Sequence, residues 1–279
     1  NKRHASTFYA IDLIGAAGGA LVSVYLLNTF SLVFVVAIAI ALLLVVWAIH
    51  AFASKNRYSM ALSLLSVAII ILMGLGKDAL DIDIPISKDP SKDMYRLMNN
   101  PALQSEKLES RWSAFGKTDL VQFTYPDSTV SKTMFIDGAA GTEVVNIDEL
   151  AKDNIKIRKA LSGFPAVFAM NFVNENDKDS VLIIGPGGGI DIAAAYFSGY
   201  SYVDAVEVNP SFVQLMEKYN PATFLEKENI KVEVNEGRNF VIKNKGKYDA
   251  ILLTIPVTKG SRGTDFYGLT ENYLFTMEA

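Results

Sequence analysis

The stretch that decides the fold is residues 181–191, VLIIGPGGGID. It begins with a short, fully apolar run of the kind that a buried parallel strand shows. Gly185, Gly187, Gly188 and Gly189 follow at once, before a segment with a helical pattern. Glycines at this point let the backbone turn tightly and approach a ligand, and the helix N-terminus offers N–H groups. The stretch therefore predicts the strand, loop and first helix of a ligand-binding α/β domain.

The alternation of strands and helices continues after this stretch. The further runs YVDAVEV, IKVEV and YDAILLT are separated by helical patterns, at residues 202–208, 210–219, 230–234, 239–243 and 248–254. Four strands joined by helices predict a parallel, doubly wound, Rossmann-like sheet. The chain starts without Met and ends within an amphipathic helical pattern at 272–278. We therefore expect a fragment of a longer protein, without the C-terminal strands of the sheet.

The end of the second strand indicates the class of ligand. Glu207 lies 22 residues after Gly185, where a carboxylate can accept hydrogen bonds from both ribose hydroxyls. A dinucleotide-binding loop would carry a further glycine where Ile190 stands, which disfavours an NAD-dependent dehydrogenase. The spacing Gly185-x-Gly187-x-Gly189 suits S-adenosylmethionine better, so we expect an adenosyl ligand.

A second indication follows the third strand, at Glu236 and Gly237. In adenosylmethionine-binding domains an acid at this place commonly meets the adenine amino group. The alternative for Glu236 is an ordinary solvated loop acid.

The beginning of the chain is apolar enough to enter a membrane. Residues 13–54 contain no Asp, Glu, Lys or Arg, and this run of 42 residues is long enough for two spanning helices. The polar pair Asn28-Thr29 marks the turn between them. We expect an integral, multi-pass membrane region over residues 1–76, with spans at 8–28, 31–52 and 58–75.

Small residues and charges near the spans bear on assembly and orientation. Gly15 and Gly19 let another helix approach closely, which favours helix packing and is compatible with a homo-oligomer. Asp12 either reaches the lipid headgroups or has a function in the membrane. The basic residues flanking the spans would place the acidic domain outside by the positive-inside rule. Adenosyl donors are made in the cytosol, so we expect this domain on the cytoplasmic side of a bacterial inner membrane.

Between the spans and the sheet the sequence changes character twice. Residues 77–104 are polar, contain prolines and predict a linker with one short helix. The runs TDLVQFTY and SKTMFID, separated by a turn cluster at 126–128 and followed by TEVVNI, predict a small antiparallel β-subdomain over 105–150. The Rossmann-like domain then occupies 151–279.

Composition excludes several classes of function. Of 26 basic and 30 acidic residues, 22 basic and 29 acidic ones lie after residue 76, which disfavours a nucleic-acid partner. The chain has no Cys, and its two histidines, His4 and His50, lie in the apolar region. Thiolate chemistry, a Ser–His–Asp triad and a His-ligated zinc are therefore excluded after residue 76, and we expect no metal.

The motifs VLIIGPGGGID, AVEVNP, NEGRNF, YDAILL and LTENYLFTMEA, in this order and spacing, resemble the spermidine/spermine synthase family of aminopropyltransferases. The match is closer to its bacterial membrane-embedded branch, which FYAIDLIGAAGGAL, RWSAFGKTDLV and FIDG also resemble. The resemblance implies a Rossmann-like transferase domain of the methyltransferase type, which uses S-adenosylmethionine or its decarboxylated form. It also implies that the nucleoside is held by Gly185, Gly187, Gly188, Gly189, Glu207, Glu236 and Gly237.

The chain departs from this family where catalysis takes place. The family has an Asp where Gly188 stands, a catalytic Asp where Thr254 stands, and a Tyr-His-Glu segment that is missing here. An amine acceptor must lose a proton before it attacks, and Thr254 is no base at neutral pH. Asp191, Asp265 and Glu271 are candidate replacements, and each also has a structural explanation as a helix or loop acid.

Two classes of function remain open. The first is a membrane-embedded transferase of an aminopropyl or methyl group, acting on a polyamine or another amine. Lys259 and Arg262 favour an anionic or lipid-borne acceptor. The second is a sensor or transporter-associated membrane protein that binds an adenosyl ligand without catalysis.

Overall fold

The chain falls into two compact units. A computed structural model describes residues 2–54, 85–86, 88–152, 165–170, 172–219, 227–244 and 248–253, with positions 58, 61, 63–68, 161 and 163. Unit 1 comprises Asn1–Pro85 with Arg111–Ala114, and unit 2 comprises Ile86–Ser110 with Phe115–Ala279. The domain boundaries near residues 76, 104 and 150 stay predictions.

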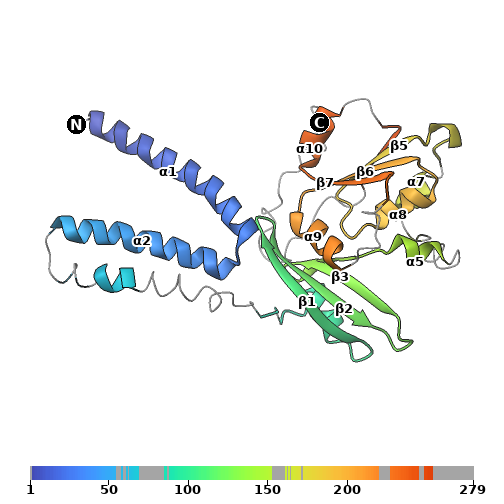
Figure 1. The fold of residues 1–279 in the computed structure, drawn as a ribbon, viewed down its shortest axis with the longest axis horizontal. Helices are drawn as coiled ribbons and strands as arrows, with labels where there is room; N and C mark the ends of the chain where they lie inside the picture. Colours follow the sequence, from blue (N-terminus) through green and yellow to red (C-terminus); the bar gives the residue numbers. More distant parts are fainter. Residues whose placement is uncertain are drawn as a thin grey trace. The chain divides into compact units, whose positions relative to one another are not determined.

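Unit 1 contains two long apolar helices, α1 (Lys2–Thr29) and α2 (Leu32–Ser54), which Figure 1 shows in blue. The stretches Ala5–Thr29 and Leu32–Ser54 are long and apolar enough to cross a membrane. Apolar side chains are exposed along both helices. A helix that is hydrophobic on all sides needs apolar surroundings, such as a lipid bilayer or a protein core. Of the third expected span, Tyr58, Ala61 and residues 63–68 are helical, and the rest lies outside the described residues.

The turn between α1 and α2 lies close to the predicted polar pair. Phe30 and Ser31 separate the helices, one residue beyond Asn28-Thr29. The Ser31 hydroxyl accepts a hydrogen bond from the backbone N–H of Phe34 at 3.5 Å, which caps the start of α2. Short polar side chains thus end one apolar helix and begin the next.

Unit 2 begins with the short helix α4 (Asp93–Met98) and a four-stranded sheet in the order β1-β2-β3-β4. The strands are β1 (Gln104–Ser113), β2 (Gly116–Thr124), β3 (Val130–Ile136) and β4 (Ala139–Glu143). β2 pairs antiparallel with β3, from Thr118 opposite Ile136 to Thr124 opposite Val130. β4 is shorter than the TEVVNI run suggests, because Asn146 caps the helix α5 (Ile147–Ala151) by accepting from the N–H of Glu149.

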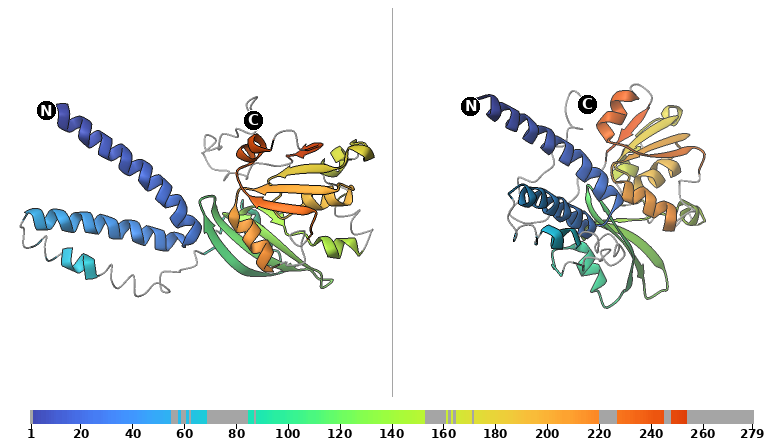
Figure 2. Two further views of the ribbon diagram at one scale, coloured as in Figure 1. Left: turned by 45° about the horizontal axis from the view of Figure 1, so that its top comes forward. Right: turned by 60° about the vertical axis from the view of Figure 1, so that its left-hand side comes forward.

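The second sheet of unit 2 is parallel and has the order β7-β6-β5-β8. Its strands are β5 (Ser180–Ile184), β6 (Tyr202–Glu207), β7 (Ile230–Val234) and β8 (Ala250–Leu252). The strands alternate with α8 (Ile190–Phe197), α9 (Pro210–Tyr219) and α10 (Gly237–Lys243), as Figures 1 and 2 show. Before β5 lie the helix α7 (Pro165–Met170) and a 3-10 turn, Glu175–Asp177. The predicted parallel α/β sheet is confirmed.

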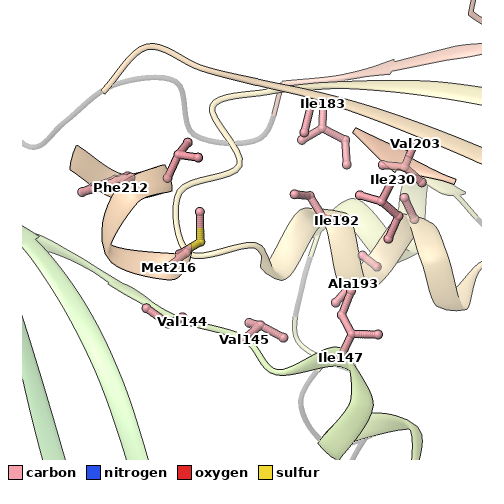
Figure 3. Packing of buried hydrophobic residues seen from close by; sticks show 14 of the residues in the cluster. Val144, Val145, Ile147, Ile183, Ile192, Ala193, Val203, Phe212, Met216 and Ile230 are labelled. Atoms are coloured by element: carbon pink, nitrogen blue, oxygen red, sulfur yellow. The ribbon is translucent and has the colours of Figure 1, made fainter. Parts of the chain in front are cut away.

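One hydrophobic core joins the two sheets of unit 2. Residues from β2, β3 and the segment after β4 pack with residues of β5, α8 and α9: Leu120, Met134, Val144, Val145, Ile147, Val181, Ile183, Ile192, Leu215 and Met216. Figure 3 shows Val144 and Val145, from the segment after β4, with Ile183 of β5 in this core. A separate cluster of Leu182, Ile184, Val206 and Phe240 lies on the other face of the parallel sheet, under α10. The β1–β4 sheet and the parallel sheet are therefore packed on one shared core.

If α2 spans a bilayer, its middle must not tolerate charge. We expect Leu43→Arg to reduce the share of full-length chain that resists alkaline carbonate extraction from membranes. An arginine at the centre of a span costs about 2.5–3.5 kcal/mol on insertion scales. The matched variant Ser54→Arg, at the end of α2, should leave extraction unchanged because its guanidinium can reach the headgroups. Equal extraction of both variants would contradict a spanning α2.

Candidate functional site

The glycine loop lies where open α/β sheets bind ligands. It leaves the carboxyl end of β5, and β5 has β6 on one side and β8 on the other. The chain therefore crosses to opposite sides of the sheet on either side of β5, which makes this a topological switch point with a crevice at the strand ends. Residues 185–189 lie at this switch point and lead into α8.

Each glycine of the loop has its own backbone reason. Gly185, Gly187 and Gly189 have φ values of +73°, +53° and +98°, in the left-handed region that other residues rarely adopt. Gly188 has no such angle, but a side chain there would overlap the carbonyl oxygen of Glu143 in β4. The sequence therefore needs glycine at 188 for space and at the other three positions for conformation.

Every backbone donor of residues 185–189 is already used inside the protein. Gly185 donates to the Val206 carbonyl at 2.9 Å, and Gly189 donates to the Pro186 carbonyl at 2.9 Å. Gly187 donates to Glu207 Oε2 at 3.2 Å, and Gly188 donates to Thr142 Oγ1 at 2.9 Å. Pro186 has no N–H to offer. The loop therefore does not present the row of donors that binds a phosphate.

Glu207 ends β6 as predicted, and its side chain is only 5% exposed. Its Oε2 accepts from Gly187, and its Oε1 accepts from the backbone N–H of Asn209 at 2.9 Å. Burial raises the pKa of the Glu207 carboxyl, and the N–H groups of Asn209, Gly187 and Val208 oppose that shift. A carboxylate has about four lone-pair sites, so these N–H groups leave room for the carboxylate to accept a further hydrogen bond.

Asn209, to which the sequence analysis gave no role, ties this carboxylate to the small sheet. Its side chain donates to Thr118 Oγ1 at 3.0 Å and accepts from the N–H of Ser211 at 3.0 Å. The Asn-Pro pair at the start of α9 was the available signal, because an Asn before a helix commonly caps it. Its link to Thr118, 91 residues away, has no signature in the sequence.

Glu236 and Gly237 follow β7, next to the end of β6. The backbone N–H of Asn235 donates to the Glu207 carbonyl at 3.1 Å, which joins the two strand ends. The Glu236 side chain caps α10 by accepting from the N–H groups of Arg238 and Asn239, at 3.0 and 2.8 Å. A contact of Glu236 with adenine stays a prediction, alongside this observed capping role.

The candidate catalytic acids divide between described and undescribed parts of the chain. Asp191 is buried in the first turn of α8, directly after the loop. Thr254, Asp265 and Glu271 lie outside the described residues, as do Lys259 and Arg262. In the part of the chain that the structure describes, no three His, Cys, Asp or Glu side chains form a group that could hold a metal ion.

Comparison with known proteins gives a likeness in structure alone. No family model matches the sequence, and no curated protein matches it. Spermidine synthase from Thermotoga maritima aligns at 21% identity and a TM-score of 0.37, over 52% of this chain and 46% of its own. A spermidine synthase in complex with the transition state analogue AdoDATO aligns at 21% identity and a TM-score of 0.39, over 55% and 48%. The aligned part is about half the length of each of these structures.

The contact at Gly188 predicts an asymmetry between two glycines. Gly188→Ala should lower the free energy of unfolding by about 1–3 kcal/mol, because its new methyl group must displace the backbone of β4. Gly163→Ala, with open space around the position, should stay within about 0.5 kcal/mol of the parent. Denaturant titration of the purified chains measures both values. Equal stability of the two variants would contradict the close packing of β4 on the loop.

Proposed function

We propose that unit 2 binds the adenosyl part of S-adenosylmethionine or its decarboxylated form and transfers an aminopropyl or methyl group from it. The proposal concerns a chain whose apolar helices α1 and α2 anchor it in a membrane, with unit 2 on the cytoplasmic side of a bacterial inner membrane. The acceptor is a polyamine or another amine, free or borne on a lipid.

The observation that carries this proposal is the chemistry of the glycine loop. Its donors are used internally, one of them on the Glu207 carboxylate, and a second acid, Asp191, follows the loop in the first turn of α8. A nucleotide phosphate would find no free loop N–H between 185 and 189, and like charges placed together cost several kcal/mol. A sulfonium is cationic, so the same carboxylates favour it. The loop thus favours a nucleoside sulfonium over NAD.

The ribose supplies a second line of support. Glu207 is held by backbone N–H groups on both oxygens, so the carboxylate is oriented before a ligand arrives. The acceptor capacity that the carboxylate retains suits a ribose hydroxyl, which is a hydrogen-bond donor. The resemblance of VLIIGPGGGID, AVEVNP and NEGRNF to the spermidine/spermine synthase family favours a transferase among the adenosyl-binding proteins.

The transfer itself needs little from the protein beyond positioning. The acceptor's lone pair forms a bond to a carbon attached to the sulfonium, the carbon–sulfur bond breaks, and its electron pair stays on sulfur as a neutral thioether. The acceptor loses one proton to a base. Holding donor and acceptor in line is the main contribution of the site. Asp191, Asp265 and Glu271 are the candidate bases, since Thr254 stands where the family has an Asp.

We expect Glu207→Gln to weaken the binding of S-adenosylmethionine and its decarboxylated form by on the order of tenfold or more. The amide has a donor where the carboxylate accepts, so it loses a ribose contact and opposes a backbone N–H. Isothermal titration of the detergent-purified chain measures both affinities. NAD, titrated in parallel, should bind more weakly than either donor.

The matched control is Glu233→Gln, on the neighbouring strand β7. Glu233 pairs with Lys231 at 3.3 Å on the surface, so its amide should leave the affinity unchanged. If the parent chain binds neither adenosyl compound, or binds NAD more tightly, the proposed function is wrong. If Glu207→Gln binds like the parent, Glu207 does not hold the ribose.

The raised pKa of Glu207 predicts opposite pH trends for binding and stability. Burial in the folded chain favours the neutral form of Glu207 more than the unfolded chain does. The contribution of Glu207 to stability is therefore present at low pH and is lost as the pH rises through the raised pKa. Ligand binding needs the carboxylate, so affinity should fall as the pH is lowered through that pKa, above the usual value of 4.5. Titrations of the parent and of Glu207→Gln across this range test the trend, which the variant should lack.

A further inference from the structure

The small antiparallel sheet and the segment after it bind the glycine loop through the backbone N–H and the backbone carbonyl of Gly188. The Gly188 N–H donates to Thr142 Oγ1 at 2.9 Å, and the Gly188 carbonyl accepts from the N–H of Val145 at 2.9 Å. Thr142 lies in β4, and Val145 lies just after this strand. Thr142 precedes Gly188 by 46 residues. The loop is therefore bonded to another sheet as well as to its own strand.

The contact leaves no space for the loop to shift toward β4. A side chain at Gly188 would overlap the Glu143 carbonyl oxygen, and a Cβ at Gly187 would lie 2.9 Å from Thr142 Oγ1. Directly after this contact, Val144, Val145 and Ile147 enter the core that the two sheets share. Because β4 is fixed by that core, the Thr142 hydroxyl is a fixed acceptor for the loop.

A bond at the Gly188 N–H also orients the group on the other side of the same peptide. In a trans peptide the N–H and the C=O point in opposite directions, so a donor aimed at Thr142 turns the Gly187 carbonyl away from β4. The N–H of Gly187, one residue earlier, donates to Glu207 Oε2. Rotation of the 187–188 peptide would disturb the link to Thr142 and, through the backbone, the link to Glu207.

The second carboxylate oxygen is tied to the same sheet by a separate route. Glu207 Oε1 accepts from the N–H of Asn209, whose side chain donates to Thr118 Oγ1 in β2 at 3.0 Å. Asn209 is 2% exposed, so no solvent competes for that bond. The Thr142 hydroxyl thus accepts from the loop, and the Thr118 hydroxyl accepts from Asn209, whose backbone N–H donates to Glu207.

We propose that Thr142 is a positioning residue for the adenosyl ligand, acting through the Gly188 peptide on the loop and on Glu207. This inference rests on the proposed function, because it assigns Thr142 a part in the same site. Thr142 does not contact the ligand itself. It keeps the loop in the one conformation in which Gly187 and Asn209 together hold the carboxylate ready for ribose.

The test compares three variants of the full-length chain in detergent. Thr142→Val keeps the shape of the side chain and removes the acceptor, whereas Thr142→Ser keeps the acceptor and removes the methyl group. Thr133→Val makes the first change in β3, the strand that pairs with β4. Hydrogen–deuterium exchange of the peptide that contains residues 185–190 is measured without ligand, and the affinity for both adenosyl donors is measured by titration.

We expect Thr142→Val to speed exchange in the loop peptide and to weaken the affinity on the order of tenfold, since a buried donor loses its partner. Thr142→Ser and Thr133→Val should resemble the parent in both measurements. Parent-like exchange and affinity in Thr142→Val would overturn the inference, and so would equal losses in Thr142→Ser, which would point to packing by the methyl group.

The two proposals fail in different ways. If the parent binds neither adenosyl donor while Thr142→Val still speeds exchange, the proposed function is wrong, and the ligand-positioning role falls with it. If the parent binds a donor and Thr142→Val neither speeds exchange nor weakens affinity, the positioning role alone is overturned.

Discussion

The backbone of β4 lies against Gly188, and the geometry of the glycine loop depends on this contact. It brings the Glu143 carbonyl, the Thr142 hydroxyl and the Val145 N–H to one glycine. The loop in turn directs the Gly187 N–H to Glu207. The Glu207 carboxylate, the loop and the small sheet are therefore three parts of one hydrogen-bonded arrangement, packed over the core that Figure 3 shows.

In this arrangement the N–H donors of the glycine loop are used within the protein, and a carboxylate lies against the loop. Loops that bind phosphates leave their N–H groups open, whereas this loop uses its N–H groups to hold a carboxylate and to attach itself to a neighbouring sheet. The Glu207 side chain lies against the loop, and Asp191 follows it in the first turn of α8. The partners of the N–H groups therefore distinguish this loop from a glycine-rich loop that binds a phosphate.

Local patterns in the sequence were enough for much of the fold. The apolar run before Gly185 and the acid at Glu207 predicted the parallel sheet and the end of β6, because strand period and glycine placement are local properties. The turn lies at Phe30-Ser31, directly after the predicted pair Asn28-Thr29. The β-subdomain predicted over 105–150 had no named run for β1 (Gln104–Ser113), since its charged, half-buried sequence carries no clear alternation. Thr142 and Thr118 were missed as well, because their partners are 46 and 91 residues away and only the tertiary fold brings them together.

These separations also order the events of folding. The hairpins β2–β3 and β3–β4 are local and can pair early, but their inner face, which includes Leu120 and Met134, shares a core with residues as far along the chain as α9. Closing such long loops carries an entropic cost that early contacts cannot offset. During synthesis we therefore expect the β1–β4 sheet to keep part of its apolar face exposed until α9 has left the ribosome. Exposed apolar surface of this kind is prone to aggregation.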